Sequence, residues 1–158
     1  MATRKVLALE NTDYKITYDI NGKPSLNTNS NISISHSYEI AAIAISDNSK
    51  IGLDIQLNGN KIFNIQHKFL NPSEKLNIGE NPSLIILTMI WTSKESIYKA
   101  IGLKGTSLSN NIIIDKVVEK DKTGIGYYIN GTEKVKFDLK FFYIDEYTIC
   151  YACQNLKL

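Results

Sequence analysis

The stretch Ser83–Gly102, SLIILTMIWTSKESIYKAIG, carries the strongest structural signal of the chain. Serine is a common helix N-cap, and glycine is common directly after the last helical residue. We therefore predict a helix from Ser83 to Ile101, about 28 Å long. The apolar run Leu84–Ile90 leaves no polar face on the first turns, whereas charged residues follow in Trp91–Lys99. This pattern predicts a helix that is buried at its start and carries charged groups toward its end.

The sequence after this helix is typical of an antiparallel meander. Turn-forming residues separate segments with strand character. We predict strands at Asn111–Val118, Ile125–Ile129, Val135–Tyr143 and Tyr147–Cys153. A helical middle followed by consecutive strands favours the α+β class. The fold that we predict is α+β, with an antiparallel sheet packed against the long helix in a single domain over residues 1–158.

The sequence before the helix predicts further strands and a short helix. Ile32–Ser37 has the length of a short strand, and Glu39–Ser46 is an apolar run closed by polar residues. A new apolar run begins at Ile51, so we predict a hairpin of two strands that delivers Asp54 at its far end. Asn71–Glu74 combines a cap, a proline for the first turn and a glutamate three residues after the cap. This combination predicts the start of a short helix.

Length and composition describe an ordinary globular domain. The chain has 158 residues, of which 43% are hydrophobic and 22% charged. Its 18 basic and 16 acidic side chains give a net charge of +2, far from the strongly basic balance of nucleic-acid-binding domains. No apolar run has the length of a signal peptide or a membrane span, so we expect a cytoplasmic protein without a nucleic-acid or membrane partner. Cys150 and Cys153 lack a second pair of zinc ligands, so we expect ordinary core or surface residues.

Two carboxylates are candidate metal ligands. Asp54 lies at the end of an apolar run, and Glu95 lies between Lys94 and Lys99 on the predicted helix. Mg²⁺ takes one or two protein carboxylates and fills its other positions with water and phosphate oxygens. Together with the two lysines, these residues would form a diphosphate site. The alternatives are a surface ion pair between Glu95 and Lys99, worth about 0.3 kcal/mol, and a turn or cap role for Asp54.

Four motifs follow one another along the chain: Gly22-Lys23-Pro24, Ser33-Ile34-Ser35-His36-Ser37, Gly52-Leu53-Asp54 and Trp91-Thr92-Ser93-Lys94-Glu95-Ser96-Ile97-Tyr98-Lys99. In their order and approximate spacing the chain resembles the 4'-phosphopantetheinyl transferases from about residue 14 to residue 154. The chain resembles the larger type, related to the surfactin-synthetase activator, more than the small trimeric holo-acyl-carrier-protein synthases, because the first two motifs belong to the larger type.

The resemblance implies transfer of the phosphopantetheine arm of coenzyme A to a serine of an apo acyl or peptidyl carrier protein, with release of 3',5'-ADP. It implies that Asp54 and Glu95 bind Mg²⁺ together with the coenzyme A diphosphate. Glu95 would also help to remove the proton of the attacking serine. Lys99 would stabilise charge on the diphosphate, and Lys94 would lie along the same phosphates.

The resemblance also indicates which residues would bind the nucleotide end of coenzyme A, and it shows one departure at the metal site. Ser35 and His36 match positions that hold the 3'-phosphate end of coenzyme A, and Lys23 matches a lysine near the nucleotide. The larger type usually has a second acid two positions after the aspartate, where this chain has Gln56. Residues two apart on a strand face the same way, so Gln56 would offer the metal a carbonyl oxygen without the charge. We therefore expect weaker magnesium binding.

The start of the chain is the second departure from the larger type. Only about 20 residues precede the Gly22-Lys23-Pro24 motif, so most of the first half of the larger type has no counterpart. Because uncovered apolar surface is unfavourable, we expect a homo-oligomer or a reduced family member. The leading hypothesis is a magnesium-dependent phosphopantetheinyl transferase. The alternatives are a non-catalytic relative that binds coenzyme A or a carrier protein, and a structural interaction domain with fortuitous motifs.

Overall fold

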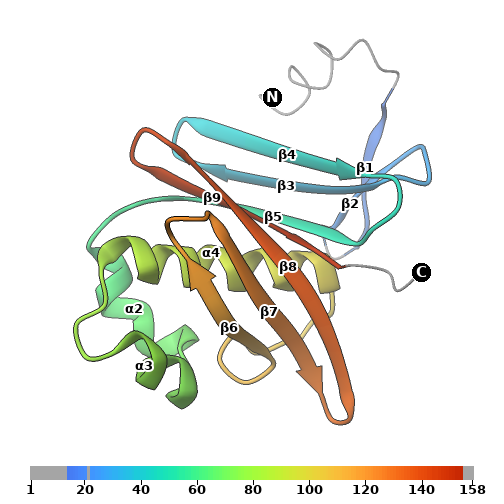
Figure 1. Cartoon of the computed structure of the whole chain (residues 1–158). Coiled ribbons are helices and arrows are strands. Elements are labelled where there is room, and N and C mark those ends of the chain that lie inside the picture. Colours follow the sequence, from blue (N-terminus) through green and yellow to red (C-terminus); the bar gives the residue numbers. More distant parts are fainter. Residues whose placement is uncertain (1–13, 21, 155–158) are drawn as a thin grey trace.

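The computed structural model describes residues 14–20 and 22–154. Short strands come first, three helices form the middle, and four strands follow them (Figure 1). The elements are β1 (Ile16–Tyr18), β2 (Pro24–Leu26), β3 (Asn31–Ser37), β4 (Ile40–Ser46), β5 (Ile51–Leu57), α2 (Lys61–Phe69), α3 (Pro72–Ile78), α4 (Leu84–Ile101), β6 (Ile112–Val118), β7 (Thr123–Asn130), β8 (Glu133–Ile144) and β9 (Tyr147–Cys153).

A five-stranded antiparallel sheet forms the main layer, and α4 packs across one of its faces (Figure 1). Its strand order is β5-β9-β8-β7-β6, so the last four strands form the predicted meander and β5 joins it at the edge beside β9. The core between α4 and the sheet holds side chains that are at most 2% exposed, among them Leu87, Ile90 and Ile97 from α4 and Phe137 and Phe141 from β8. The α+β class and the helix on the sheet are confirmed.

The sequence of α4 explains both its limits and its burial. The hydroxyl of Ser83 accepts a hydrogen bond from the backbone N–H of Ile86 at 3.2 Å, which caps the first turn. Gly102 ends the helix in the left-handed region at φ 66°, where a side chain would be strained. The buried hydroxyls of Thr88 and Thr92 donate to backbone carbonyls one turn earlier in the helix. Polar residues can therefore be buried in this helix without losing hydrogen bonds.

Glycine at position 52 lets α4 approach β5 closely. A Cβ atom on Gly52 would overlap the carbonyl oxygen of Ser96 and would lie 2.8 Å from the backbone nitrogen of Ala100. Both obstacles are backbone atoms of α4, which cannot move aside like a flexible side chain. The short distance between strand and helix therefore depends on the absence of a side chain at this position.

The predicted hairpin of residues 39–46 with the strand from Ile51 is wrong in its pairing. The two strands exist, but β4 pairs with β3, with Ile40 opposite Ser37 and Ser46 opposite Asn31. The partner of β5 is β9, with Asp54 opposite Cys150. The polar break at residues 47–50 marks a turn between the strands, and it carries no information about which strand each one pairs with. Pairing was decided by a strand nearly a hundred residues later in the chain.

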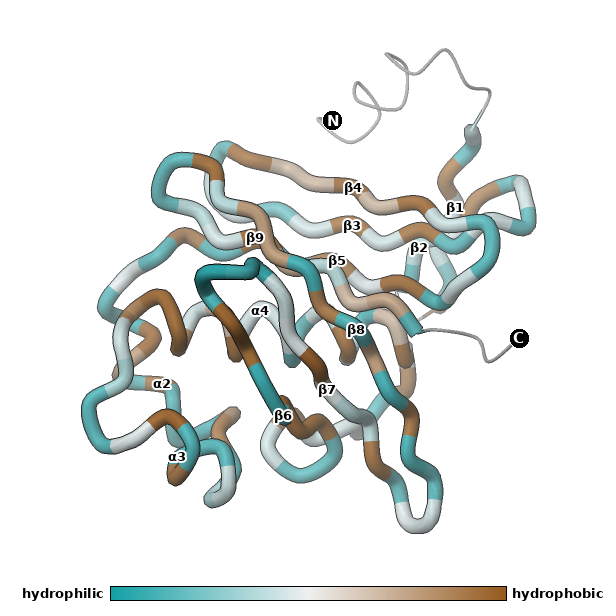
Figure 2. The backbone as a smooth tube through the Cα atoms, viewed as in Figure 1, coloured by the Kyte–Doolittle hydropathy of each residue, from teal (hydrophilic) through white to brown (hydrophobic). Residues whose placement is uncertain are grey.

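The β3–β4 hairpin lies against the outer edge of β5 (Figure 1). Its apolar residues Ile40, Ala42 and Ala44 pack on the buried side chains of Leu53 and Ile55. Figure 2 shows the apolar character that runs along β4 and the hydrophilic turns that join the strands. Among the described residues, β4 has a strand partner only in β3. The predicted homo-oligomer stays a prediction.

The short helix α3 begins as predicted, with a complete capping box. The side chain of Asn71 accepts from the N–H of Glu74 at 2.8 Å, and the carboxylate of Glu74 accepts from the N–H of Asn71 at 2.9 Å. Pro72 occupies the first helical position, where its missing N–H has no partner to lose.

The two cysteines form no disulfide with each other. Cys150 and Cys153 are both free, and Cys150 lies in the core, where burial raises the pKa of its thiol to about 12. A thiol with this pKa stays protonated and is a poor nucleophile.

No helix in the described ranges combines the length and apolar character needed to cross a membrane.

Candidate active site

Asp54 and Glu95 come together where the middle of β5 faces α4. The predicted position of Asp54 at the end of its strand is therefore wrong, because three strand residues follow it. Asp54 lies on the α4 side of its strand and is 7% exposed. Burial raises its pKa, while the ammonium of Lys99 acts in the opposite direction. Burial also raises the pKa of Glu95, and the negative charge of Asp54 raises it further. Two partly desolvated carboxylates that repel each other form a region that favours a cation.

Lys99 already supplies one positive charge at this position. Its ammonium donates to the Oδ1 atom of Asp54 at 2.7 Å, to the hydroxyl of Ser35 at 3.0 Å and to the carbonyl of Leu53 at 3.0 Å. An ammonium has three donors, so all of them are used. The alternative of a surface ion pair between Glu95 and Lys99 is not found, because Lys99 pairs with the buried carboxylate of Asp54 on β5.

Glu95 differs from Asp54 in its partners. Among the residues that the structure describes, none donates a hydrogen bond to its carboxylate or forms an ion pair with it. The carboxylate is half-buried, so it is partly removed from water without a compensating donor. The nearby charge of Lys99 acts on its pKa in the opposite direction to burial, but burial has the larger effect. A half-buried carboxylate without a hydrogen-bond donor is suited to accept a proton or to bind a cation.

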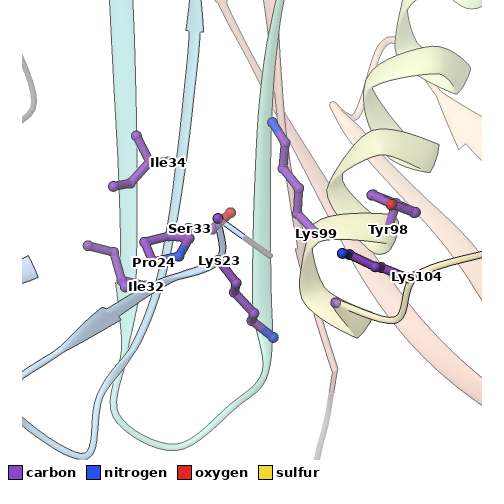
Figure 3. Close-up of a pocket in the computed structure, with 10 residues that line it drawn as sticks. Lys23, Pro24, Ile32, Ser33, Ile34, Tyr98, Lys99 and Lys104 are labelled. Atoms are coloured by element: carbon purple, nitrogen blue, oxygen red, sulfur yellow. The ribbon is translucent and has the colours of Figure 1, made fainter. Parts of the chain in front are cut away.

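A pocket of about 250 Å³ opens beside Lys99, at the C-terminal end of α4. Lys23, Lys99 and Lys104 contribute positive charge to it, and the described residues that line it include no acid. Its apolar lining comes from Pro24, Ile32, Ile34 and Tyr98. In Figure 3 the ammonium groups of Lys23 and Lys99 point in opposite directions, so their charges are spread along the pocket. This lining fits an anion that carries a flat or apolar group.

A second pocket, of about 320 Å³, lies beside Trp91 of α4, where this helix faces α2. Its lining is mainly apolar, with Trp91 from α4 and Ile62 and Ile65 from α2. Gln56 from β5 and Lys61 from α2 also line it. The side-chain amide of Gln56 donates to the carbonyl of Leu57 at 3.1 Å. Trp91, Glu95 and Lys99 lie four residues apart on one face of the helix, about 12 Å from first to last. The two carboxylates therefore lie between an apolar pocket and a basic one.

The prediction that Lys94 lies along the phosphates is wrong. Its side chain is fully buried, and its ammonium forms an ion pair with Glu74 at 2.8 Å. It also donates to the carbonyls of Leu108 and Ile112, at 2.8 and 2.6 Å. Consecutive residues of a helix face directions about 100° apart, so Lys94 points toward β6 while Glu95 points toward β5. Lys94 joins α3, α4 and β6, and burial lowers its pKa.

Of the three residues predicted to bind the nucleotide end of coenzyme A, only Lys23 lines the basic pocket. Lys23 lines the basic pocket, as expected for a lysine near a nucleotide. Ser35 does not line it, because its hydroxyl donates to Asp54 and accepts from Lys99 and from the N–H of Ile55. Its hydroxyl uses its one donor and two acceptor positions within the protein, and a contact of Ser35 with phosphate stays a prediction. His36 is exposed on the opposite face of β3, and its role stays a prediction.

Two residues of the basic pocket were missed by the sequence reasoning. Lys104 follows the helix end in Gly102-Leu103-Lys104-Gly105, and Tyr98 precedes Lys99. A lysine directly after a helix that carries the candidate acids was the available signal for Lys104. Tyr98 carried no separate signal, because an aromatic residue at that position is equally compatible with the core.

Comparison with known families identifies the region that carries this geometry. A model of the 4'-phosphopantetheinyl transferase superfamily matches residues 50–152, which run from β5 to β9 and contain Asp54, Gln56, Glu95 and Lys99. The chain belongs to the 4'-phosphopantetheinyl transferase superfamily. This phosphopantetheinyl transferase has no match among curated proteins. The matched region begins after Lys23 and Ser35, so the larger type, which rests on the motifs around them, stays a prediction.

Membership in the superfamily assigns the general chemistry. The protein is a transferase of the phosphopantetheinyl type, and the matched region holds the carboxylates that the sequence singled out. In this phosphopantetheinyl transferase the two acids lie between a basic pocket and a mainly apolar one.

Proposed function

We propose that the protein transfers the 4'-phosphopantetheine arm of coenzyme A to a serine of an apo acyl or peptidyl carrier protein, with Mg²⁺, and releases 3',5'-ADP. The observation that carries this proposal is the pair of coupled carboxylates, Asp54 and Glu95, beside the Lys99 ammonium and between two pockets. Coenzyme A has a nucleotide, a diphosphate and a pantetheine arm in linear order. The basic pocket, the carboxylates and the apolar pocket follow one another along α4 in an order that suits these parts.

The residues present fit a magnesium ion. Mg²⁺ binds oxygen ligands and needs only one or two protein carboxylates when substrate phosphates complete its shell. Asp54 and Glu95 supply two carboxylates with raised pKa values, and Gln56 would add a neutral oxygen. No cluster of three or more acidic, histidine or cysteine residues that could hold a metal occurs in the described part of the chain. This donor set favours a metal that shares its coordination with phosphate over one held by protein alone.

The chain's own residues would divide the chemistry as follows. Glu95, which has no hydrogen-bond donor among the described residues, accepts the proton of the carrier serine as its oxygen attacks the phosphorus that bears pantetheine. A bond forms between the serine oxygen and that phosphorus, and the bond to the bridging diphosphate oxygen breaks. Lys99 neutralises charge on the diphosphate, and Lys23 and Lys104 hold the departing 3',5'-ADP. Bound Mg²⁺ would supply further stabilisation of the charge on the leaving phosphate.

A mass measurement tests the proposal. The protein is incubated with coenzyme A, Mg²⁺ and an apo carrier protein, and the carrier is weighed. We expect a mass gain equal to one phosphopantetheine group, which disappears in Asp54→Ala and Glu95→Ala. Glu133→Ala, which removes an exposed acid at the turn between β7 and β8, serves as the control and should keep the gain.

The same measurement distinguishes the alternative. If no carrier of fatty acid, polyketide or peptide synthesis gains mass, while the protein still binds coenzyme A in a calorimetric titration, the protein is a binding relative without transfer. Gln56 is the feature that favours this alternative, because it provides no charge for the metal.

Gln56→Glu tests whether residue 56 is a ligand of the metal. Residues 54 and 56 lie on the same side of β5, so a carboxylate at position 56 would add a charge near the metal. We expect the Mg²⁺ concentration for half-maximal transfer to fall about tenfold, because ligand charge tunes the affinity of such sites. Asn130→Asp adds a carboxylate at the distant turn between β7 and β8 and should leave it unchanged. An unchanged magnesium requirement in Gln56→Glu would exclude Gln56 from the ligands.

A further inference from the structure

Ser35 occupies an unusual position between the hairpin and the candidate active site. It lies on β3, outside the five-stranded sheet, and it is 6% exposed. Its hydroxyl donates to the Oδ1 atom of Asp54 at 2.8 Å, and accepts from the N–H of Ile55 at 3.3 Å and from the ammonium of Lys99 at 3.0 Å. One hydroxyl therefore contacts both members of the charged pair and the backbone of the strand that carries one of them.

The neighbouring serines show which of these contacts the fold requires. The hydroxyls of Ser33 and Ser37 accept from the N–H groups of Leu53 and Leu57, at 2.8 and 3.3 Å. β5 is an edge strand of the main sheet, so three serines at alternate positions of β3 satisfy N–H groups that have no strand partner. Accepting one backbone hydrogen bond is thus the common role of the three residues. Only Ser35 also donates to a carboxylate and accepts from an ammonium.

The geometry at Asp54 suggests what the additional contacts do. Both side-chain hydrogen bonds to this carboxylate, from Ser35 and from Lys99, go to Oδ1. Oδ2 receives no side-chain hydrogen bond from the described residues. The backbone N–H of Ile55 also interacts with the carboxylate. Two side-chain donors on the same oxygen restrain the orientation of the carboxylate and leave Oδ2 without a side-chain partner among the described residues.

Resting on the proposed function, we propose that Ser35 is a positioning residue, which holds Oδ1 of Asp54 beside Lys99 so that Oδ2 is presented to the metal. Without the hydroxyl, Oδ1 loses its neutral donor and Lys99 loses one acceptor. The carboxylate is then free to rotate and to pair with Lys99 through both oxygens, which covers the oxygen that a metal needs. The effect of Ser35 on the metal passes through Asp54, and Ser35 is not itself a ligand.

Metal binding in the presence of coenzyme A, but without a carrier protein, tests this role, because the phosphates complete the shell of the metal and no transfer takes place. Mn²⁺, as a probe for Mg²⁺, is titrated calorimetrically into the wild-type protein, Ser35→Ala and Ser37→Ala. Both variants remove one hydroxyl that accepts from the backbone of β5. We expect a larger loss of thermal stability in Ser35→Ala, because this variant also loses hydrogen bonds to Asp54 and Lys99. We expect Ser35→Ala to weaken Mn²⁺ binding about 10- to 100-fold, as is typical when a hydrogen-bond partner of a metal ligand is removed. Ser37→Ala should bind Mn²⁺ as the wild type does.

The outcomes separate this proposal from the proposed function. If the wild type transfers phosphopantetheine but Ser35→Ala binds Mn²⁺ with wild-type affinity, or if Ser37→Ala loses as much affinity as Ser35→Ala, the positioning role is refuted and the proposed function stands. If the wild type neither binds Mn²⁺ nor transfers phosphopantetheine, the proposed function fails and the positioning role fails with it.

Discussion

Glu95→Gln is expected to reduce kcat/KM for carrier modification about 1,000-fold or more. Glutamine keeps the size of the side chain but removes both its charge and its ability to take a proton. General base catalysis alone contributes about 10²- to 10⁴-fold, and the loss of a metal ligand adds to that effect. The measurement is the initial rate of mass gain of a carrier protein at saturating Mg²⁺. A rate within tenfold of the wild type would show that Glu95 is neither the base nor a ligand.

The same variant should be more stable than the wild type when no metal is present. Burial and the charge of Asp54 raise the pKa of Glu95 above its ordinary value of 4.5, so the ionised form is disfavoured in the folded protein. For a carboxyl with a raised pKa, the folded state is penalised as the pH rises from the unfolded pKa through the folded pKa. In EDTA, Glu95→Gln should therefore melt at a higher temperature than the wild type at neutral pH. The two melting temperatures should converge below pH 4.5.

The expected rise in melting temperature of Glu95→Gln is the control that its loss of activity does not come from misfolding. A variant that loses activity while it gains thermal stability has not lost activity by unfolding. A Glu95→Gln protein that melts below the wild type at neutral pH would contradict the raised pKa. In that case the carboxylate would have a favourable partner in the folded protein.

Gly52→Ala is expected to lower the free energy of unfolding by about 3 kcal/mol, at the upper end for added volume in a packed interior. The new Cβ atom would overlap the carbonyl oxygen of Ser96 and approach the backbone of Ala100. Because these are backbone atoms in the middle of α4, the whole helix must move away from β5. The measurement is urea unfolding followed by the fluorescence of Trp91.

Transfer activity should fall together with stability in this variant. Displacing α4 separates Glu95 and Lys99 from Asp54, and small displacements of catalytic groups reduce rates strongly. Gly59→Ala is the matched control, because its nearest atom would be 3.9 Å from the new Cβ. Its stability should stay within about 0.5 kcal/mol of the wild type. Equal stability of the two variants would mean that helix and strand are not in close contact at Gly52.

Much of the fold was accessible from local sequence patterns. The helix α4 begins and ends where serine and glycine predicted, and the capping box of α3 was visible in Asn71–Glu74. Such signals depend on neighbours within about four residues, so they survive in any context. The meander was readable for the same reason, because its turns are short and each strand pairs with the next.

Pairings between distant segments were not accessible in this way. The order of the elements suggested that β4 pairs with β5, but β5 pairs with β9 and β4 with β3. Lys94 stands beside Glu95 in the sequence, yet its partner Glu74 lies on another helix. In both cases the sequence shows residue types and order, while the partner depends on which surfaces meet when the chain packs.

By itself, the sequence determined the helix, the meander and the identity of the acids Asp54 and Glu95, because these follow from local propensity and from motifs with fixed spacing. Only the tertiary structure decided which partners surround those acids. In the folded protein Lys94 is the buried partner of Glu74, and Lys99 pairs with Asp54. The hydroxyl of Ser35 forms hydrogen bonds with both Asp54 and Lys99. The physical reason is that a charge takes the partner that packing and burial bring within hydrogen-bond distance, and those partners come from strands and helices far apart in the chain.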